Sequence, residues 1–166
     1  MTTHSALPSA FIKGVFETHL NVANLERSAQ FYEQVLGLQL GTRDDARRLA
    51  IYWVGGWGHA FVGLWEKPQG QILNQHFAFE VDLGSLKQAI ASLTRQRIEI
   101  RNFFSERTEV PSVFGWIPAA SVYFDDPDGH LLELLAKLPG PPRPEIGIVP
   151  LPEWNRLNAT GTLTKT

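Results

Sequence analysis

The chain has 166 residues, of which 43% are hydrophobic and 19% are charged, a composition typical of a folded globular protein. A net charge of -2, without any run of Lys or Arg, gives no long-range attraction for nucleic acid. Cysteine is absent, which excludes thiol catalysis, thiolate metal ligation and a disulfide-stabilised secreted scaffold.

Residues 1–14 are predicted to form an N-terminal extension that precedes the first regular element. This extension has no continuous apolar stretch of signal-peptide length, and no later segment approaches the length of a membrane span. We therefore expect a cytoplasmic protein with neither a nucleic-acid partner nor a membrane partner.

The first predicted strand covers residues 15–22, where polar and apolar side chains alternate. One face of this strand carries Glu17, His19 and Asn21. A helix is predicted next, because Asn24 is a suitable cap and apolar residues then recur at helical spacing up to residue 36. Two strand-like runs follow, at residues 49–54 and 60–65.

The same pattern starts again at residue 76. A predicted strand over residues 76–81 begins with His76 and is followed by a helix with an apolar stripe from Leu83 to Leu93. Further strand-like runs are predicted at residues 97–100, 119–124 and 131–136. Each half therefore reads as a strand, a helix and two or three further strands.

The spacing within the two halves relates His19 to His76. The step from His19 to Leu36 is 17 residues, and the step from His76 to Leu93 is also 17 residues. The two histidines are therefore predicted to be equivalent, and duplicated modules paired about a pseudo-twofold axis would bring them together. A repeat of this kind is also easily imagined in any chain of mixed strands and helices.

Glu133 is the most informative single residue, because it interrupts the otherwise apolar run from Leu131 to Ala136. A buried carboxylate without a partner costs several kcal/mol, so an interior Glu133 needs a cation or a shifted pKa. The alternative is a surface glutamate on an edge strand. A lone strand histidine is usually structural, but two equivalent histidines and one isolated carboxylate together suggest a 2-His-1-carboxylate metal site.

These residues resemble a known family. The run YFDDPDGHLLEL, at residues 123–134, resembles the closing motif of the vicinal oxygen chelate superfamily. This superfamily groups glyoxalase I, fosfomycin-resistance enzymes, extradiol dioxygenases and bleomycin-resistance proteins. The run THLNV at residues 18–22 resembles the start of its first module, and NQHFAF at residues 74–79 resembles the start of its second module.

The resemblance implies an α+β fold in which two paired βαβββ modules, about residues 15–70 and 74–137, form a half-open barrel around a metal site. It implies that His19, His76 and Glu133 hold one divalent metal ion (Mn, Zn, Ni or Fe(II)). Glyoxalase I adds a fourth carboxylate ligand late in the first module, whereas this chain has none there before Glu66. Three-ligand relatives, the fosfomycin enzymes and the extradiol dioxygenases, therefore match better.

The resemblance leaves three functions open. The first is a glyoxalase or fosfomycin-resistance type of enzyme, in which the metal acts as a Lewis acid on a small-molecule substrate that chelates it through oxygens. The second is an Fe(II) extradiol-type ring-cleaving dioxygenase, and the third is a drug- or metabolite-binding protein without turnover. Tyr123 is the candidate catalytic residue, because a phenol near the metal is able to hydrogen-bond an oxyanion; the alternative is an ordinary strand tyrosine.

Aromatic residues are numerous, and most aromatic side chains in a protein of this size belong to the core. Four of them are predicted to line a substrate pocket: Trp53, Trp65, Phe114 and Trp116. Residues 138–166 form a proline-rich tail, with six of the eleven prolines between Pro139 and Pro152. We expect this tail to be a strap that packs on the domain or on a partner subunit of a possible homodimer.

Overall fold

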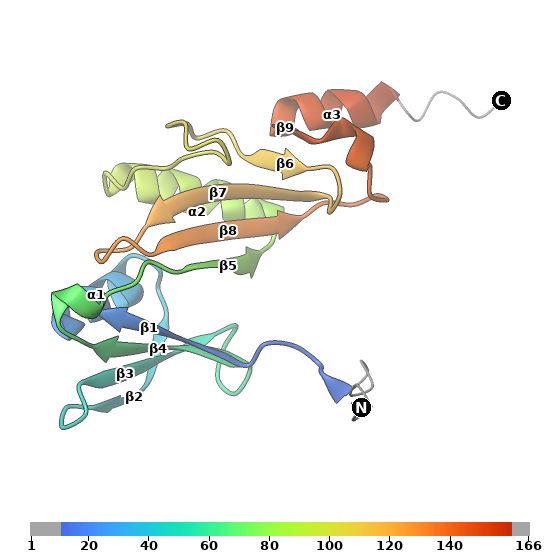
Figure 1. The fold of residues 1–166 in the computed structure, drawn as a ribbon. Helices are drawn as coiled ribbons and strands as arrows, with labels where there is room; N and C mark the ends of the chain where they lie inside the picture. The colour runs from blue at the N-terminus through green and yellow to red at the C-terminus, as the bar shows by residue number, and fades with distance from the viewer. Residues whose placement is uncertain (1–10, 161–166) are drawn as a thin grey trace, which may run out of the picture. The chain divides into compact units, whose positions relative to one another are not determined.

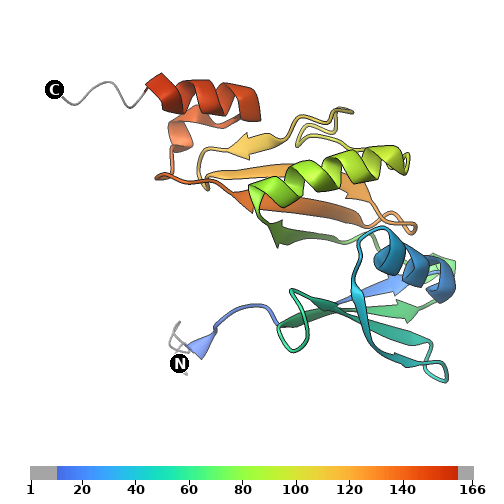
Figure 2. The same cartoon turned by 180° about the vertical axis from the view of Figure 1, so that it is seen from behind.

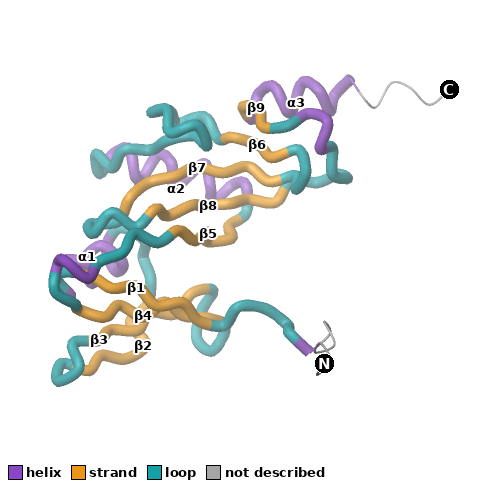
Figure 3. Tube along the Cα trace, viewed as in Figure 1, coloured by secondary structure: helices purple, strands orange, loops and turns teal. Residues whose placement is uncertain are grey.

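The computed structural model describes residues 11–160 of the chain, and the chain divides into two compact units, Met1–Ile72 and Leu73–Thr166. Both units combine helices with one open sheet (Figure 1; Figure 3). The predicted α+β class is therefore confirmed. Neither sheet closes on itself as a barrel, because each has two different edge strands.

The first unit contains a four-stranded sheet with the order β1-β4-β3-β2. Strand β1 lies parallel to β4, and the other neighbours are antiparallel. Its elements are β1 (Glu17–Val22), α1 (Leu25–Gln34), β2 (Gln39–Asp44), β3 (Leu49–Val54), β4 (Ala60–Glu66) and the short 3-10 helix η2 (Gln69–Gln71).

Helix α1 covers one face of this sheet. The side chain of Asn24 accepts a hydrogen bond from the backbone N–H of Arg27, which caps the first turn as the sequence predicts. The apolar stripe of α1 packs on β3 and β4, and Tyr32 in this stripe is fully buried. Because side chains alternate along a strand, burial of Leu20 and Val22 leaves Glu17 and His19 on the face opposite the helix.

The second unit contains a five-stranded sheet with the order β5-β8-β7-β6-β9, in which β5 lies parallel to β8. Helix α2 lies across one face of it (Figure 2). Its elements are β5 (His76–Val81), α2 (Leu83–Arg95), β6 (Ser112–Phe114), β7 (Ala119–Asp125), β8 (Leu131–Lys137), η3 (Pro144–Ile146), β9 (Ile148–Pro150) and α3 (Leu151–Thr160).

The prediction of a strand at residues 97–100 is wrong. This segment is a loop, and Arg97 adopts a φ of 60°, which interrupts an extended backbone. Only Arg101, just beyond it, forms isolated bridges, with Arg107 and with Tyr123. Charged and apolar residues alternate in this segment, and Ile100 is buried in the core. The segment nevertheless forms no strand of the sheet.

The described part of the proline-rich tail, residues 138–160, packs on the second unit. Strand β9 adds to the sheet antiparallel to β6, and Leu151 and Trp154 of α3 are buried. The tail therefore covers the backbone hydrogen-bonding groups that β6 would otherwise expose at the sheet edge. Within residues 11–160, no helix is long and apolar enough to cross a membrane.

Replacement of Trp154 by Ala is expected to lower the free energy of unfolding by about 3–5 kcal/mol, because the side chain is 3% exposed and its removal leaves a cavity under α3. Urea unfolding followed by circular dichroism measures this loss. Trp116→Ala is the matched control, because Trp116 is 65% exposed and should change stability by less than about 0.5 kcal/mol. Equal losses in both variants would contradict a stabilising role for the tail.

Candidate metal centre

His76 and Glu133 form a close pair on the second sheet. The parallel ladder sets Ala78 of β5 beside Glu133 of β8, so that the first residue of β5, His76, lies diagonally across from the carboxyl group. The Nε2 atom of His76 is 3.3 Å from Oε2 of Glu133. The face that carries this pair is opposite the one that packs on α2, where Leu132 and Ala136 are fully buried.

The orientation of the His76 ring leaves one nitrogen free for a cation. Its Nδ1 lies 3.0 Å from the backbone carbonyl oxygen of Leu131. A carbonyl only accepts hydrogen bonds, so Nδ1 carries the proton and Nε2 of the neutral ring presents a lone pair. That lone pair faces a carboxyl oxygen, and the contact becomes favourable when a proton or a metal cation lies between the two atoms. Metal-bound histidines are commonly oriented in this way by a backbone carbonyl.

Glu133 is buried with one oxygen unused. The residue is 5% exposed, and among the described residues its Oε1 has no hydrogen-bond partner. Because β8 lies between β5 and β7, the alternative of a surface glutamate on an edge strand is wrong. A buried carboxylate oxygen without a partner is costly, whereas a bound cation would satisfy it. Together with the His76 nitrogen, this donor set fits a divalent metal ion.

Tyr123 lies directly beside the pair, because β7 and β8 set it opposite Glu133 in the ladder. Its ring centroid is 6.0 Å from that of His76. Burial raises the pKa of the Tyr123 phenol above its ordinary value, and the negative charge of Glu133 raises it further. The side chain is therefore held as a neutral phenol, which is a hydrogen-bond donor.

His19 belongs to the first unit, where it has different partners. The indole N–H of Trp65 donates a hydrogen bond of 2.9 Å to Nδ1 of His19, and Nε2 of His19 is 3.7 Å from Oε1 of Glu17. Within residues 11–160, no three His, Asp or Glu side chains gather closely enough to hold a metal ion. The two donors of the second unit lie together, and His19 as a third ligand stays a prediction.

The four aromatic residues predicted for a substrate pocket have separate surroundings. In the first unit, Trp53 and His19 both contact Phe61, with ring centroids 6.0 Å and 5.8 Å away, and Trp65 bonds His19 directly. Phe61 was not predicted as a site residue from the sequence. The alternation along β4 is the signal for it, because Phe61 lies on the same face of the strand as Trp65.

In the second unit, Phe114 is buried on β6 and contacts Phe103, which also contacts Tyr123. Phe103 thus extends the apolar surface beside the phenol. Trp116 lies in the turn after β6 and is 65% exposed. None of the ring contacts found among the described residues includes Trp116.

Glu66 has a structural role. It is the carboxylate nearest to the fourth-ligand position of glyoxalase I. It lies on the same face of β4 as the buried Leu64, accepts a hydrogen bond from the backbone N–H of Leu25, and forms an ion pair of 2.7 Å with Arg48. Hydrogen bonds from Arg48 lower the pKa of the Glu66 carboxyl. It therefore anchors the start of α1 and faces away from His19.

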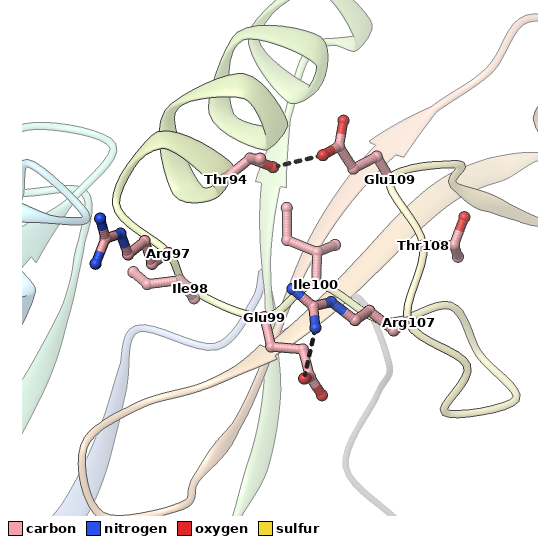
Figure 4. A pocket seen from close by; sticks show the side chains of 8 residues that line it. All are labelled: Thr94, Arg97, Ile98, Glu99, Ile100, Arg107, Thr108 and Glu109. Atoms are coloured by element: carbon pink, nitrogen blue, oxygen red, sulfur yellow. Dashed lines mark hydrogen bonds and ion pairs between the residues drawn. The ribbon is translucent and has the colours of Figure 1, made fainter.

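A hollow of about 520 Å³ lies on the second unit beyond the end of α2 (Figure 4). Its two glutamates are already paired, Glu109 with the hydroxyl of Thr94 and Glu99 with Arg107. None of the residues that line it belongs to the His76–Glu133 pair or to the aromatic residues named above. The candidate chemistry therefore lies on the sheet face rather than in this hollow.

Comparison with known proteins places this geometry in a family. Residues 14–134 match the model of the glyoxalase/bleomycin resistance protein/dioxygenase superfamily. The chain belongs to this superfamily. The resemblance to the vicinal oxygen chelate proteins that the sequence predicted is therefore confirmed.

Two individual proteins are moderately similar to this chain. It is 27% identical over 135 residues to a lactoylglutathione lyase of Neisseria meningitidis serogroup A. The aligned residues cover 76% of this chain and 92% of the lyase. It is 36% identical to the integron cassette protein HFX_CASS4 from the mobile metagenome of the Halifax Harbour sewage outfall, with a TM-score of 0.67 over 75% of this chain and 99% of the other.

A more distant structure shows the same fold. The fosfomycin resistance protein FosX of Mesorhizobium loti is 20% identical, with a TM-score of 0.54 over 76% of this chain and 94% of that chain. This likeness concerns the fold alone. The name of the matched superfamily itself spans glyoxalases, bleomycin resistance proteins and dioxygenases, so the fold does not by itself decide the activity.

The pKa of Tyr123 should fall when the charge beside it is removed. In metal-free Glu133→Gln protein the negative charge is lost but burial remains, so that the pKa is expected to fall toward the ordinary tyrosine value without reaching it. Titration of ring-¹³C-labelled tyrosines by NMR measures this, and the Tyr123→Phe variant assigns the resonance. An unchanged pKa would show that the charge of Glu133 does not reach the phenol.

Proposed function

We propose that this protein is a divalent-metal-dependent enzyme of the glyoxalase and fosfomycin-resistance type, which acts on a small molecule that chelates the metal through oxygens. The observation that carries the proposal is the His76–Glu133 pair, in which a ring-nitrogen lone pair faces a buried carboxyl group 3.3 Å away. A divalent cation bound by both atoms would make this contact favourable.

Two residues of the second unit would hold the ion, His76 through Nε2 and Glu133 through its carboxylate. Imidazole nitrogen and carboxylate oxygen suit Mn, Fe(II), Ni and Zn, and a small number of protein ligands leaves positions for substrate oxygens. His19 stays the third ligand that the sequence predicts. One relative, the lactoylglutathione lyase, supports this type of chemistry by name.

The bound cation would supply Lewis-acid polarisation of a substrate oxygen. The backbone carbonyl of Leu131 keeps the His76 ring turned toward the ion. The Tyr123 phenol, protonated at neutral pH, would donate a hydrogen bond to the oxygen on which negative charge develops. Phe103 and Phe114 would keep water from the side of the site beside Tyr123 and favour an apolar portion of the substrate.

Elemental analysis of protein purified anaerobically without chelators tests the proposal directly, with His76→Ala as the comparison. We expect about one equivalent of manganese, nickel or zinc in the parent protein and a large loss in the variant. Iron in place of these metals would favour the ring-cleaving dioxygenase. Failure of the parent to bind any divalent ion, even after soaking, would leave a binding protein without metal chemistry.

Glu133→Gln is expected to weaken metal binding at least about 100-fold, because it replaces an anionic ligand by a neutral amide. Titration of the chelator-stripped protein with Mn²⁺ or Zn²⁺ by calorimetry measures the affinity. Glu80→Gln is the matched control, since Glu80 is an exposed carboxylate on β5 that pairs with Lys137 at 2.9 Å. The control should bind as tightly as the parent; equal binding by Glu133→Gln would contradict the ligand assignment.

Tyr123→Phe should retain the metal and lower kcat about 100-fold once a substrate is identified, because only the hydroxyl that stabilises the developing charge is lost. Metal content measured alongside the steady-state kinetics separates this effect from ligand loss. A variant as fast as the parent would return Tyr123 to the role of an ordinary strand tyrosine.

A further inference from the structure

His130 is a fully buried histidine that the candidate metal centre does not use. It lies at the end of the turn between β7 and β8. A buried imidazole needs hydrogen-bond partners for its polar atoms, so its contacts indicate its role. The Nδ1 atom of His130 accepts a hydrogen bond of 3.1 Å from the backbone N–H of Gln75, the residue directly before His76. His130 thus contacts the chain immediately before a candidate ligand.

The turn that carries His130 is held by its own hydrogen bonds. The buried carboxylate of Asp126 accepts bonds of 2.9 Å from the backbone N–H groups of Asp128 and His130. The backbone N–H of Asp126 donates to the carbonyl oxygen of His130 at 3.0 Å. Gly129 completes the turn with a φ of 84°, a conformation that glycine adopts at little cost. The turn therefore fixes the position of the buried imidazole.

Both peptide groups of Gln75 are held by neighbouring residues of this segment. Its N–H donates to the His130 ring, and its carbonyl oxygen accepts a bond of 2.9 Å from the backbone N–H of Leu131. The carbonyl oxygen of Leu131 in turn lies 3.0 Å from Nδ1 of His76. Because β5 is an edge strand, β8 alone pairs with it. Without the His130 contact, the start of β5 would fray more readily, and the His76 ring would turn away from Leu131 more often.

The ladders of the two units correspond residue by residue, which provides an internal comparison. Glu17, the first residue of β1, pairs with Phe61, and His76, the first residue of β5, pairs with Leu131. In these ladders Glu17 corresponds to His76. The equivalence of His19 and His76 that their spacing predicts is therefore wrong by two residues.

The same correspondence assigns the buried imidazole to one unit. His130 comes directly before Leu131, whereas Ala60 comes directly before Phe61. The methyl group of alanine offers no acceptor to a backbone N–H. The unit whose first strand begins with a histidine therefore has a side-chain acceptor that the other unit lacks, although both build the same parallel ladder. A role in the ladder alone would apply equally to both units.

We propose that His130 is a positioning residue of the candidate metal centre. Its ring holds the backbone N–H of Gln75. That contact keeps the His76 ring on the Leu131 carbonyl, with Nε2 facing Glu133. The consequence for metal affinity rests on the proposed function, because partners that orient a ligand tune its binding. The orientation of the ring is itself a property of the metal-free protein.

Two replacements of His130 separate hydrogen bonding from packing. His130→Asn keeps an acceptor, because the side-chain oxygen of asparagine is bonded to Cγ, as Nδ1 is in histidine. His130→Leu keeps a similar volume but removes the acceptor. A packing role alone would make leucine the better replacement, whereas the positioning role makes asparagine the better one. Circular dichroism checks that each variant is folded.

Long-range ¹H–¹⁵N NMR of the metal-free protein, at a pH where histidines are neutral, reads the His76 tautomer directly. We expect the proton on Nδ1 of His76 in the parent and in His130→Asn, and a mixture of both tautomers in His130→Leu. His76→Ala assigns the resonances. A parent-like tautomer in folded His130→Leu overturns the proposal. Loss of the Nδ1 tautomer in folded His130→Asn also overturns it, and this variant decides the matter if His130→Leu does not fold.

Titration with Zn²⁺ by calorimetry measures the consequence for binding. We expect His130→Leu to bind about 10- to 100-fold more weakly than the parent, and His130→Asn to bind within about threefold of it. Glu80→Gln is again the control with unchanged affinity. The reverse order of the two His130 variants would contradict the proposal. Failure of the proposed function looks different, because the parent would then bind neither Mn²⁺ nor Zn²⁺ while the tautomer comparison keeps its outcome.

Discussion

The candidate site of the second unit depends on one interaction, the contact between the His76 ring and the buried carboxyl group of Glu133. Two acceptor atoms 3.3 Å apart repel each other unless a proton or a metal cation lies between them. The sheet nevertheless holds both atoms there, since Leu131 fixes the ring from behind and the strands on either side of β8 bury the carboxyl group. Under the proposed function, the two donors would be ordered before the cation binds, which limits the entropic cost of binding.

Parallel pairing of the first and last strands makes this arrangement possible. In both units the pair β1–β4 or β5–β8 sets side chains from distant parts of the sequence on the face that the helix leaves uncovered. Apolar residues of the same strands, such as Leu20 and Leu132, hold the opposite face against the helix. Polar chemistry on one face is thus supported by core packing on the other.

The two units share this architecture but use it differently. In the second unit the carboxylate comes from the last strand and the imidazole from the first. In the first unit both groups come from β1, because Gly63 leaves the position on β4 open for the His19 ring. Trp65 then determines which nitrogen of that ring is protonated.

The sequence alone was sufficient to predict the α+β class, the repeated strand–helix pattern, the Asn24 helix cap and the unusual position of Glu133 within an apolar strand, because alternation and capping are local and an isolated charge among leucines is conspicuous. It also marked Tyr123, ten residues earlier. Only the tertiary structure decided the strand pairing within each sheet, the extra strand β9 and the direction of each histidine ring. Ring direction depends on a hydrogen bond to Leu131 or Trp65, residues 55 and 46 positions away, and ladders between distant strands are invisible to local spacing.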